Sequence, residues 1–227
     1  MISSCSPVRI ACLGDSITQG RVKLDTLEQL SSYRYYLWLK LDSANYNVKF
    51  VGSVRKLFKE DSDHPSIYKK SPYTGHIFDA FHEGHWGWKT AEIIDSLNYW
   101  LEGYNPDIVL IHLGDNDVNA KIDSIGIAQN LKSIISILRT KNPNVKILLA
   151  KIITVWCTQV NHAVPLIAAK LSTQRSPVIT VDLASGFIND PKLNWTMTVD
   201  WVHPNEKGAK WMADRWYNSI VPLLGNK

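Results

Sequence analysis

Short β-branched runs alternate along this chain with longer stretches whose apolar residues recur at helical spacing. The short runs are rich in valine, isoleucine and leucine, and they predict strands over Val8–Leu13, Val48–Val51, Ile108–Leu113, Val145–Ala150 and Val178–Val181. Apolar residues three and four positions apart are typical of amphipathic helices. This spacing predicts helices over Tyr33–Leu41, Thr90–Leu101, Ser124–Arg139, His162–Ser172 and Asn205–Leu223.

Strands that alternate with helices favour right-handed β-α-β crossovers and a parallel sheet covered on both faces. The nearly continuous apolar character of Ile108–Leu113 fits a strand that is buried on both sides. We therefore expect a three-layer α/β/α sandwich around a five-stranded parallel sheet. A chain of 227 residues suits one such domain better than two, so we expect residues 1–227 to form a single domain.

Charge and hydropathy exclude several classes of partner. The formal net charge is +4, and the densest basic stretch, 55–70, is diluted by Glu60, Asp61 and Asp63. A nucleic-acid site needs a clustered basic face, so we expect no nucleic-acid partner. We also expect no membrane partner, because no apolar run approaches the roughly 20 residues that span a bilayer.

Three other features of the sequence give weaker indications of compartment, metal binding and function. Met1–Pro7 lacks the layout of a signal peptide, so we expect a cytosolic protein or a secreted one whose leader has been removed. Three widely spaced cysteines, Cys5, Cys12 and Cys157, suggest neither a disulfide framework nor a zinc site. The segment Val54–Glu83 breaks the alternation, and loops of that length are usually functional or disordered.

A serine directly follows the first predicted strand, in the run Gly-Asp-Ser that ends at Ser16. Ligands of open parallel sheets bind outside the carboxyl ends of the strands, so the Ser16 hydroxyl lies at the expected site. Its backbone N–H, near a helix start, can stabilise an oxyanion. The alternative interpretation is that Ser16 or Thr18 only caps the helix. The dinucleotide-binding pattern Gly-x-Gly-x-x-Gly is absent here.

An aspartate and a histidine three residues apart, Asp200 and His203, precede the last predicted helix. A serine hydroxyl is a poor nucleophile until a base removes its proton. Histidine serves as that base when a carboxylate fixes its tautomer and stabilises the imidazolium. A lone histidine is more often a packed or surface residue, but an aspartate at this spacing, together with Ser16, favours a catalytic pair.

Two further blocks carry polar groups. The run Gly-Asp-Asn-Asp after the third strand contains Asn116, whose amide is either a donor to an oxyanion or part of a turn. In the second block, Gly87 offers a backbone N–H that can approach a substrate closely. His82, Glu83 and His85 in that block suggest a metal as an alternative. Their spacing is not that of the His-Glu-x-x-His helix, so we expect no metal.

The four blocks, in this order, resemble the SGNH (GDSL-like) hydrolase superfamily and extend over nearly the whole chain. The resemblance implies a flavodoxin-like strand order and ester hydrolysis without a metal or organic cofactor. It also implies that Ser16 is the nucleophile and that Asp200 orients His203 as the base. The implied oxyanion hole consists of the Ser16 N–H, the Gly87 N–H and the Asn116 side chain.

The wording of the second block, His-Glu-Gly-His-x-Gly-Trp, is similar to carbohydrate esterase family 3, whose members remove acetyl groups from xylan. Asn161, which opens the helix after the fourth strand, also resembles that family. Trp86 departs from it, because a small residue is expected there, and the bulky ring would either narrow the site or alter the preference for acyl groups. Asp115, an acid beside the proposed oxyanion donor, is a second departure.

Tryptophans near strand ends and motif loops give a separate indication of the substrate. Indole faces pack on sugar rings, although core packing is the usual role of any one tryptophan. We expect Asp15, Trp86, Trp88 and Trp201 to contact substrate, while Trp156 and Trp195 lie in similar positions. The expected substrate is a small-molecule or polysaccharide ester, foremost an acetylated plant polysaccharide or its oligosaccharides. The alternatives are a lysophospholipase or thioesterase acting on longer acyl chains, and a carbohydrate-binding module without turnover.

Overall fold

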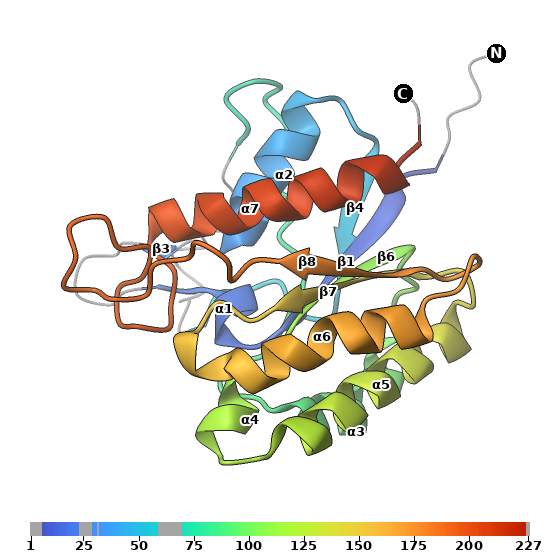
Figure 1. Ribbon diagram of the computed structural model, residues 1–227. Coiled ribbons are helices and arrows are strands. Elements are labelled where there is room, and N and C mark those ends of the chain that lie inside the picture. Colours follow the sequence, from blue (N-terminus) through green and yellow to red (C-terminus); the bar gives the residue numbers. More distant parts are fainter. Residues whose placement is uncertain (1–5, 23–28, 31, 59–69, 226–227) are drawn as a thin grey trace.

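A parallel sheet forms the centre of the molecule (Figure 1). The structure is a computed structural model that describes residues 6–22, 29–30, 32–58 and 70–225. Its main strands are β1 (Val8–Gly14), β4 (Val48–Val51), β6 (Ile108–His112), β7 (Lys146–Lys151) and β8 (Val178–Asp182), in the spatial order β4-β1-β6-β7-β8. All four pairings are parallel. This order is the flavodoxin-like one, so the predicted fold class is confirmed.

One short strand of this sheet was not predicted. β5 (Glu83–Gly84) pairs in parallel with the end of β1, Leu13 opposite Glu83 and Gly14 opposite Gly84. β4 pairs with β1 only as far as Ala11, and β5 pairs with the part of β1 that follows. Gly84 is required there, since a Cβ at this position would lie 2.5 Å from the backbone nitrogen of Gln19. A separate antiparallel pair joins β2 (Arg21–Val22) and β3 (Gln29–Leu30).

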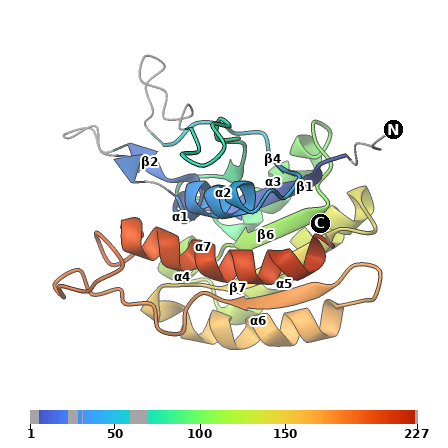
Figure 2. The same cartoon turned by 90° about the horizontal axis from the view of Figure 1, so that it is seen from above.

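Helices cover both faces of the sheet, as Figures 1 and 2 show. One face carries α2 (Tyr33–Ser43) and α7 (Glu206–Ile220), and the other carries α3 (Thr90–Trp100), α5 (Ser124–Lys141) and α6 (Thr158–Leu171). Successive side chains of a strand point to opposite faces. In β1, Ile10 and Cys12 therefore join the core beneath α2 and α7, whereas Ala11 and Leu13 join the other core.

The five predicted helices are confirmed, with shifts at their ends. A 3₁₀ turn, η2 (Val155–Cys157), leads directly into α6, which begins at Thr158 rather than His162. At the other end of the chain α7 stops at Ile220 and continues as the 3₁₀ turn η3 (Val221–Leu223), because Pro222 has no N–H to extend the α-helical ladder. Two short helices, α1 (Ser16–Gln19) and α4 (Asp115–Asn119), follow the carboxyl ends of β1 and β6.

Several predictions concern segments only partly described. Residues 59–69 of the irregular segment and of the basic stretch lie outside the described residues, as does Cys5. Cys12 and Cys157 are buried free thiols. Among the residues with described positions, no helix combines the length and apolar character needed to cross a bilayer. The same part of the chain gathers no group of three or more His, Cys, Asp or Glu side chains suited to a metal ion.

Candidate active site

Ser16 lies where β1 ends and α1 begins, with a side chain that is largely buried. The helix is capped by Asp15, whose carboxylate accepts a hydrogen bond of 3.0 Å from the Ile17 N–H. The Ser16 hydroxyl is therefore not used as a cap. Its oxygen lies 2.9 Å from Nε2 of His203, which comes from the opposite end of the chain.

Asp200 holds the His203 ring from its other side. Nδ1 of His203 lies 2.8 Å from Oδ2 of Asp200, and the second carboxylate oxygen accepts from the His203 backbone N–H at 2.8 Å. Burial alone would raise the pKa of the Asp200 carboxyl, but hydrogen bonds from the ring and backbone of His203 lower this pKa to about 2. Asp200 is thus a carboxylate at neutral pH and accepts the Nδ1 proton, which leaves Nε2 free to accept the proton of Ser16.

Asn116 and Gly87 lie on two segments that the structure joins. Asn116, in α4, donates a hydrogen bond of 3.0 Å from Nδ2 to the carbonyl of Trp88. Gly87 adopts a left-handed φ of 79° and is exposed, and its N–H has no hydrogen-bond partner within the described chain. The Trp86 N–H beside it donates to Oε1 of Gln19 at 2.8 Å. This bond ties the Gly87 turn to the helix that begins at Ser16.

The acidic and histidine residues of the second block form a buried hydrogen-bond network. Glu83 accepts from the backbone and hydroxyl of Ser53, at 2.8 and 2.6 Å, and from the Tyr104 hydroxyl at 2.6 Å. Nε2 of His85 lies 2.7 Å from the same carboxylate. His82 instead lies between the Lys56 carbonyl, 3.1 Å from Nε2, and the Gly84 N–H.

Burial lowers the pKa of His82 well below its usual value, so His82 is neutral. A neutral imidazole has one donor nitrogen and one acceptor nitrogen, and the Lys56 carbonyl and Gly84 N–H use one each. His82, Glu83 and His85 therefore have internal partners that fix the block in position.

Trp86 is enclosed between two rings. Its indole stacks on the His203 imidazole, with centroids 4.7 Å apart and planes 12° from parallel, and on Phe58, at 4.5 Å and 14°. Two parallel rings at these distances fit on opposite faces of one indole, since they would crowd each other on the same face. Trp86 thus lies at the site through its contact with His203, and both of its faces are covered.

The other two candidate tryptophans differ in exposure. The Trp88 ring packs against His85 and Trp100, with centroid distances of 4.6 and 5.6 Å, so it is part of the aromatic packing next to α3. Trp201 lies between Asp200 and His203 in sequence, and its side chain is 40% exposed. The structure therefore brings together Ser16, Asp200, His203 and Trp86, with Trp201 on the same loop as the histidine.

Comparison with known proteins assigns the family. The model of the GDSL-like Lipase/Acylhydrolase family matches residues 73–211, well over half of the chain. The chain belongs to this family. The matched region includes Gly87, Asn116 and both members of the Asp200–His203 pair, whereas Ser16 lies before it.

Solved structures extend this GDSL-like relationship. The chain is similar to a carbohydrate esterase family 3 structure from Talaromyces cellulolyticus, with 31% identity and a TM-score of 0.77 over 96% of this chain and 98% of the other. It is also similar to an acetyl esterase mutant crystallised with an acetate ion, with 32% identity, a TM-score of 0.76 and the same coverage. A multidomain esterase of Ruminococcus flavefaciens is 27% identical over 98% of this chain, which spans only 29% of that relative's length.

Three supporting residues of this GDSL-like site were not identified from the sequence. Gln19 holds the Trp86 backbone, and Tyr104 and Ser53 hold Glu83. Gln19 lies about one helical turn after Ser16, so its position in the sequence could have predicted that it lies near the site. The sequence did not indicate Tyr104 and Ser53 in this way, because only the tertiary fold brings them to Glu83.

Asp15, which precedes Ser16, and Asp115, which precedes Asn116, are buried acids. The Asp115 carboxylate accepts from the Thr154 hydroxyl and from Nε1 of Trp156 at 2.9 Å, so these donors hold the acid next to Asn116. Burial, together with the nearby charge of Asp115, raises the pKa of the Asp15 carboxyl to about 8. In the described structure one Asp15 oxygen is buried without a hydrogen-bond partner. Asp15 thus caps the N-terminus of α1, and its side chain is buried away from solvent.

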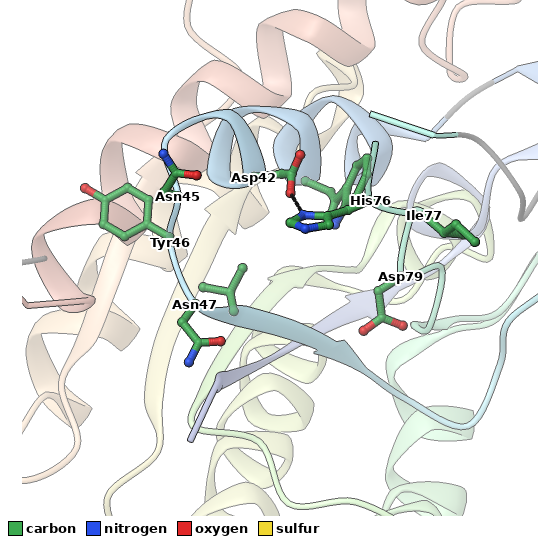
Figure 3. A pocket seen from close by; sticks show the side chains of 9 residues that line it. Asp42, Asn45, Tyr46, Asn47, His76, Ile77 and Asp79 are labelled. Atoms are coloured by element: carbon green, nitrogen blue, oxygen red, sulfur yellow. Dashed lines mark hydrogen bonds and ion pairs between the residues drawn. The ribbon is translucent and has the colours of Figure 1, made fainter. Parts of the chain in front are cut away.

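A separate cavity of about 390 Å³ lies at the other end of the sheet (Figure 3). Its lining residues are Trp38, Asp42, Asn45, Tyr46, Asn47, Val48, His76, Ile77 and Asp79. Val48 pairs with Val8 at the amino end of β1, whereas Ser16 follows the carboxyl end. Asp42 accepts from Nδ1 of His76 at 2.7 Å and from the Thr74 hydroxyl at 2.5 Å. The cavity is therefore not part of the Ser16 site.

Proposed function

We propose that this chain is a serine esterase that removes acetyl groups from carbohydrate esters through an acyl-enzyme. The observation that carries the proposal is the chain of contacts from the Ser16 hydroxyl to Nε2 of His203 at 2.9 Å and from Nδ1 to Asp200 at 2.8 Å. This arrangement meets the geometric requirement for a nucleophile, a general base and an orienting carboxylate.

The first half of the reaction forms the acyl-enzyme. Nε2 of His203 takes the proton of Ser16 while Oγ bonds to the ester carbonyl carbon, and the Asp200 carboxylate stabilises the resulting imidazolium. We assign the binding of the oxyanion to three donors, the N–H groups of Ser16 and Gly87 and the side-chain amide of Asn116. The tetrahedral intermediate then loses the alcohol, which takes the proton from His203.

The second half releases the acid. Water enters the place of the alcohol and gives a proton to Nε2 of His203 as its oxygen bonds to the acyl carbon. The intermediate collapses by breaking the bond to Oγ of Ser16, which recovers a proton from His203. The enzyme returns to its starting state, with acetate and the free alcohol as products.

Two lines of evidence favour acetyl groups on carbohydrate. The similar solved structures are described as a carbohydrate esterase family 3 structure and an acetyl esterase with an acetate ion. Trp86 stacks directly on His203, and a large indole beside the base leaves little room for a long acyl tail.

The test compares the parent with Ser16→Ala on an aryl acetate and on acetylated xylan. The parent should release acetate from both, and rapid quenching followed by mass spectrometry should find an acetyl group on the peptide that contains Ser16. Ser16→Ala should lose several orders of magnitude in turnover, because only binding and the oxyanion donors remain. Activity within about tenfold of the parent would contradict the role of Ser16, and a parent that binds acetylated xylan without turnover would indicate a binding module.

A further inference from the structure

Trp201 has a backbone conformation that disfavours its side chain. Its φ is 74°, in the left-handed region where glycine is accommodated without cost and a bulky residue is strained. Surrounding hydrogen bonds impose this conformation: Asn189 donates to the Trp201 carbonyl at 3.0 Å, and the Val202 N–H donates to Asp200 at 3.2 Å. Glycine would adopt this conformation with less strain. The local backbone geometry therefore gives no reason for a tryptophan at position 201.

Packing within the protein covers only part of Trp201. The Trp201 side chain is 40% exposed, and among the described residues it stacks on no other aromatic ring. The tryptophans nearby differ: Trp86 has rings on both faces, and Trp156 is tied to Asp115 through its N–H. Trp201 is therefore a partly exposed tryptophan on the loop that carries Asp200 and His203, and no described aromatic ring stacks on its indole.

The chemistry of the reaction places the alcohol part of the ester on this side. His203 protonates the leaving oxygen, so the alcohol extends from the region of Nε2, while the acyl oxygen faces Gly87 and Asn116. Trp201 precedes His203 by two residues, and its Cα lies within about 7 Å of the histidine Cα, since each residue spans at most ~3.6 Å. The indole is thus within reach of the first ring of a sugar leaving group.

We infer that the Trp201 indole is a stacking platform for the pyranose ring that carries the ester. The inference rests on the proposed function, in which that ring is the leaving alcohol. Indole faces suit this task because a pyranose presents an apolar C–H face of similar width, and the indole N–H remains available to a hydroxyl.

The test uses Trp201→Gly and Trp201→Phe with two substrates, an aryl acetate and an acetylated xylo-oligosaccharide. Trp201→Gly should lower the ratio of kcat/KM for the oligosaccharide to kcat/KM for the aryl acetate by roughly tenfold, through a higher KM. Trp201→Phe keeps a ring face and should keep most of the parent ratio. The Tm of Trp201→Gly reports separately on two opposing effects, the relief of backbone strain and the loss of the buried part of the indole.

Lys121 provides a matched control. It is also a non-glycine residue with left-handed φ, at 61°, and it is exposed on the turn after α4. Lys121→Gly should relieve strain in the same way without changing the substrate ratio. An unchanged ratio in Trp201→Gly, or an equal loss on both substrates, would overturn the platform while leaving the esterase intact. Failure of the parent to hydrolyse the aryl acetate would instead overturn the proposed function itself.

Discussion

The indole of Trp86 stacks on the imidazole of His203, with ring centroids 4.7 Å apart and planes within 12° of parallel. Phe58 packs on Trp86 at 4.5 Å, so the histidine lies at the end of a column of three rings. During the proposed reaction His203 becomes an imidazolium, and a cation over an indole face is stabilised by the charge distribution of the ring. Trp86 therefore restricts the ring plane of His203, and we expect its indole face to stabilise the charge that develops on this ring in the transition state.

The contact between these two rings predicts that Trp86→Leu lowers kcat by about 2- to 30-fold, the range that corresponds to a cation–π contact of about 0.5–2 kcal/mol. KM for an aryl acetate should change much less, because the contact strengthens as charge develops. Trp86→Phe retains a ring face and should stay within about threefold of the parent. An unchanged kcat in Trp86→Leu, with altered preference among acyl groups, would mean that Trp86 only limits the space for the acyl group and does not stabilise the charged His203.

Replacement of Asn116 separates an oxyanion donor from a turn residue. Asn116→Ala should lower kcat by roughly 10²–10³ if the amide binds the oxyanion, with little change in KM because that interaction is made mainly in the transition state. The variant also loses the hydrogen bond to the Trp88 carbonyl, at a cost of about 1 kcal/mol in stability. Asn119→Ala, in the same helix, is the control. A loss of stability with unchanged kcat would favour the turn role.

Acyl-chain length distinguishes the proposed acetyl esterase from the long-chain alternative. We expect kcat/KM to fall from aryl acetate through propionate to butyrate, by a factor that corresponds to about 1–3 kcal/mol for each methylene group, because the Trp86 indole lies beside His203, the proposed base. Octanoate should be the poorest substrate of the series. Octanoate hydrolysed as well as acetate would favour a lysophospholipase or thioesterase.

The buried carboxyl of Asp15 predicts a specific pH dependence of stability. Its pKa in the folded protein is about 8, above the ordinary value of 3.8 that we assign to the unfolded chain. Between these values the folded protein holds a proton that the unfolded chain has released. The stabilising contribution is therefore complete below pH 3.8 and declines, by up to about 1.4 kcal/mol per pH unit, until pH 8.

Asp15→Asn removes this titration and keeps an N-cap for the Ile17 N–H. The free energy of unfolding, measured by urea titration from pH 5 to pH 8, should fall more steeply with pH in the parent than in Asp15→Asn. Parallel curves for the two proteins would show that Asp15 does not carry a raised pKa.

The sheet and its covering helices were predictable because the burial of each element determines the spacing of its apolar residues along the sequence. Every residue of β6 is buried, so Ile108–His112 appears as an unbroken apolar run that ends in histidine. The buried positions of α5 recur at three- and four-residue steps, from Ile127 to Leu138. Both patterns depend only on neighbours along the chain, and for this reason one sequence was sufficient to recognise them.

The parts of the site that escaped prediction depend on contacts between distant segments. β5 is two residues long and carries a buried glutamate, so neither length nor hydropathy marks it as a strand. The side-chain partners of Glu83 are Ser53, Tyr104 and His85, of which only His85 is near in sequence. The column of Phe58, Trp86 and His203 likewise joins three separate segments, and nothing in the local composition of any one of them indicates the other two.

The hydrogen bond between Ser16 and His203 closes a loop of 187 residues, almost the full length of the chain. Contacts of such sequence separation carry a high entropic cost and form only once intervening segments have folded. Hydrolytic activity should consequently appear late in refolding, after the helical signal has recovered. A nascent chain on the ribosome would be inactive until α7 and its preceding loop had emerged, so that turnover reports on completion of the fold rather than on any part of it.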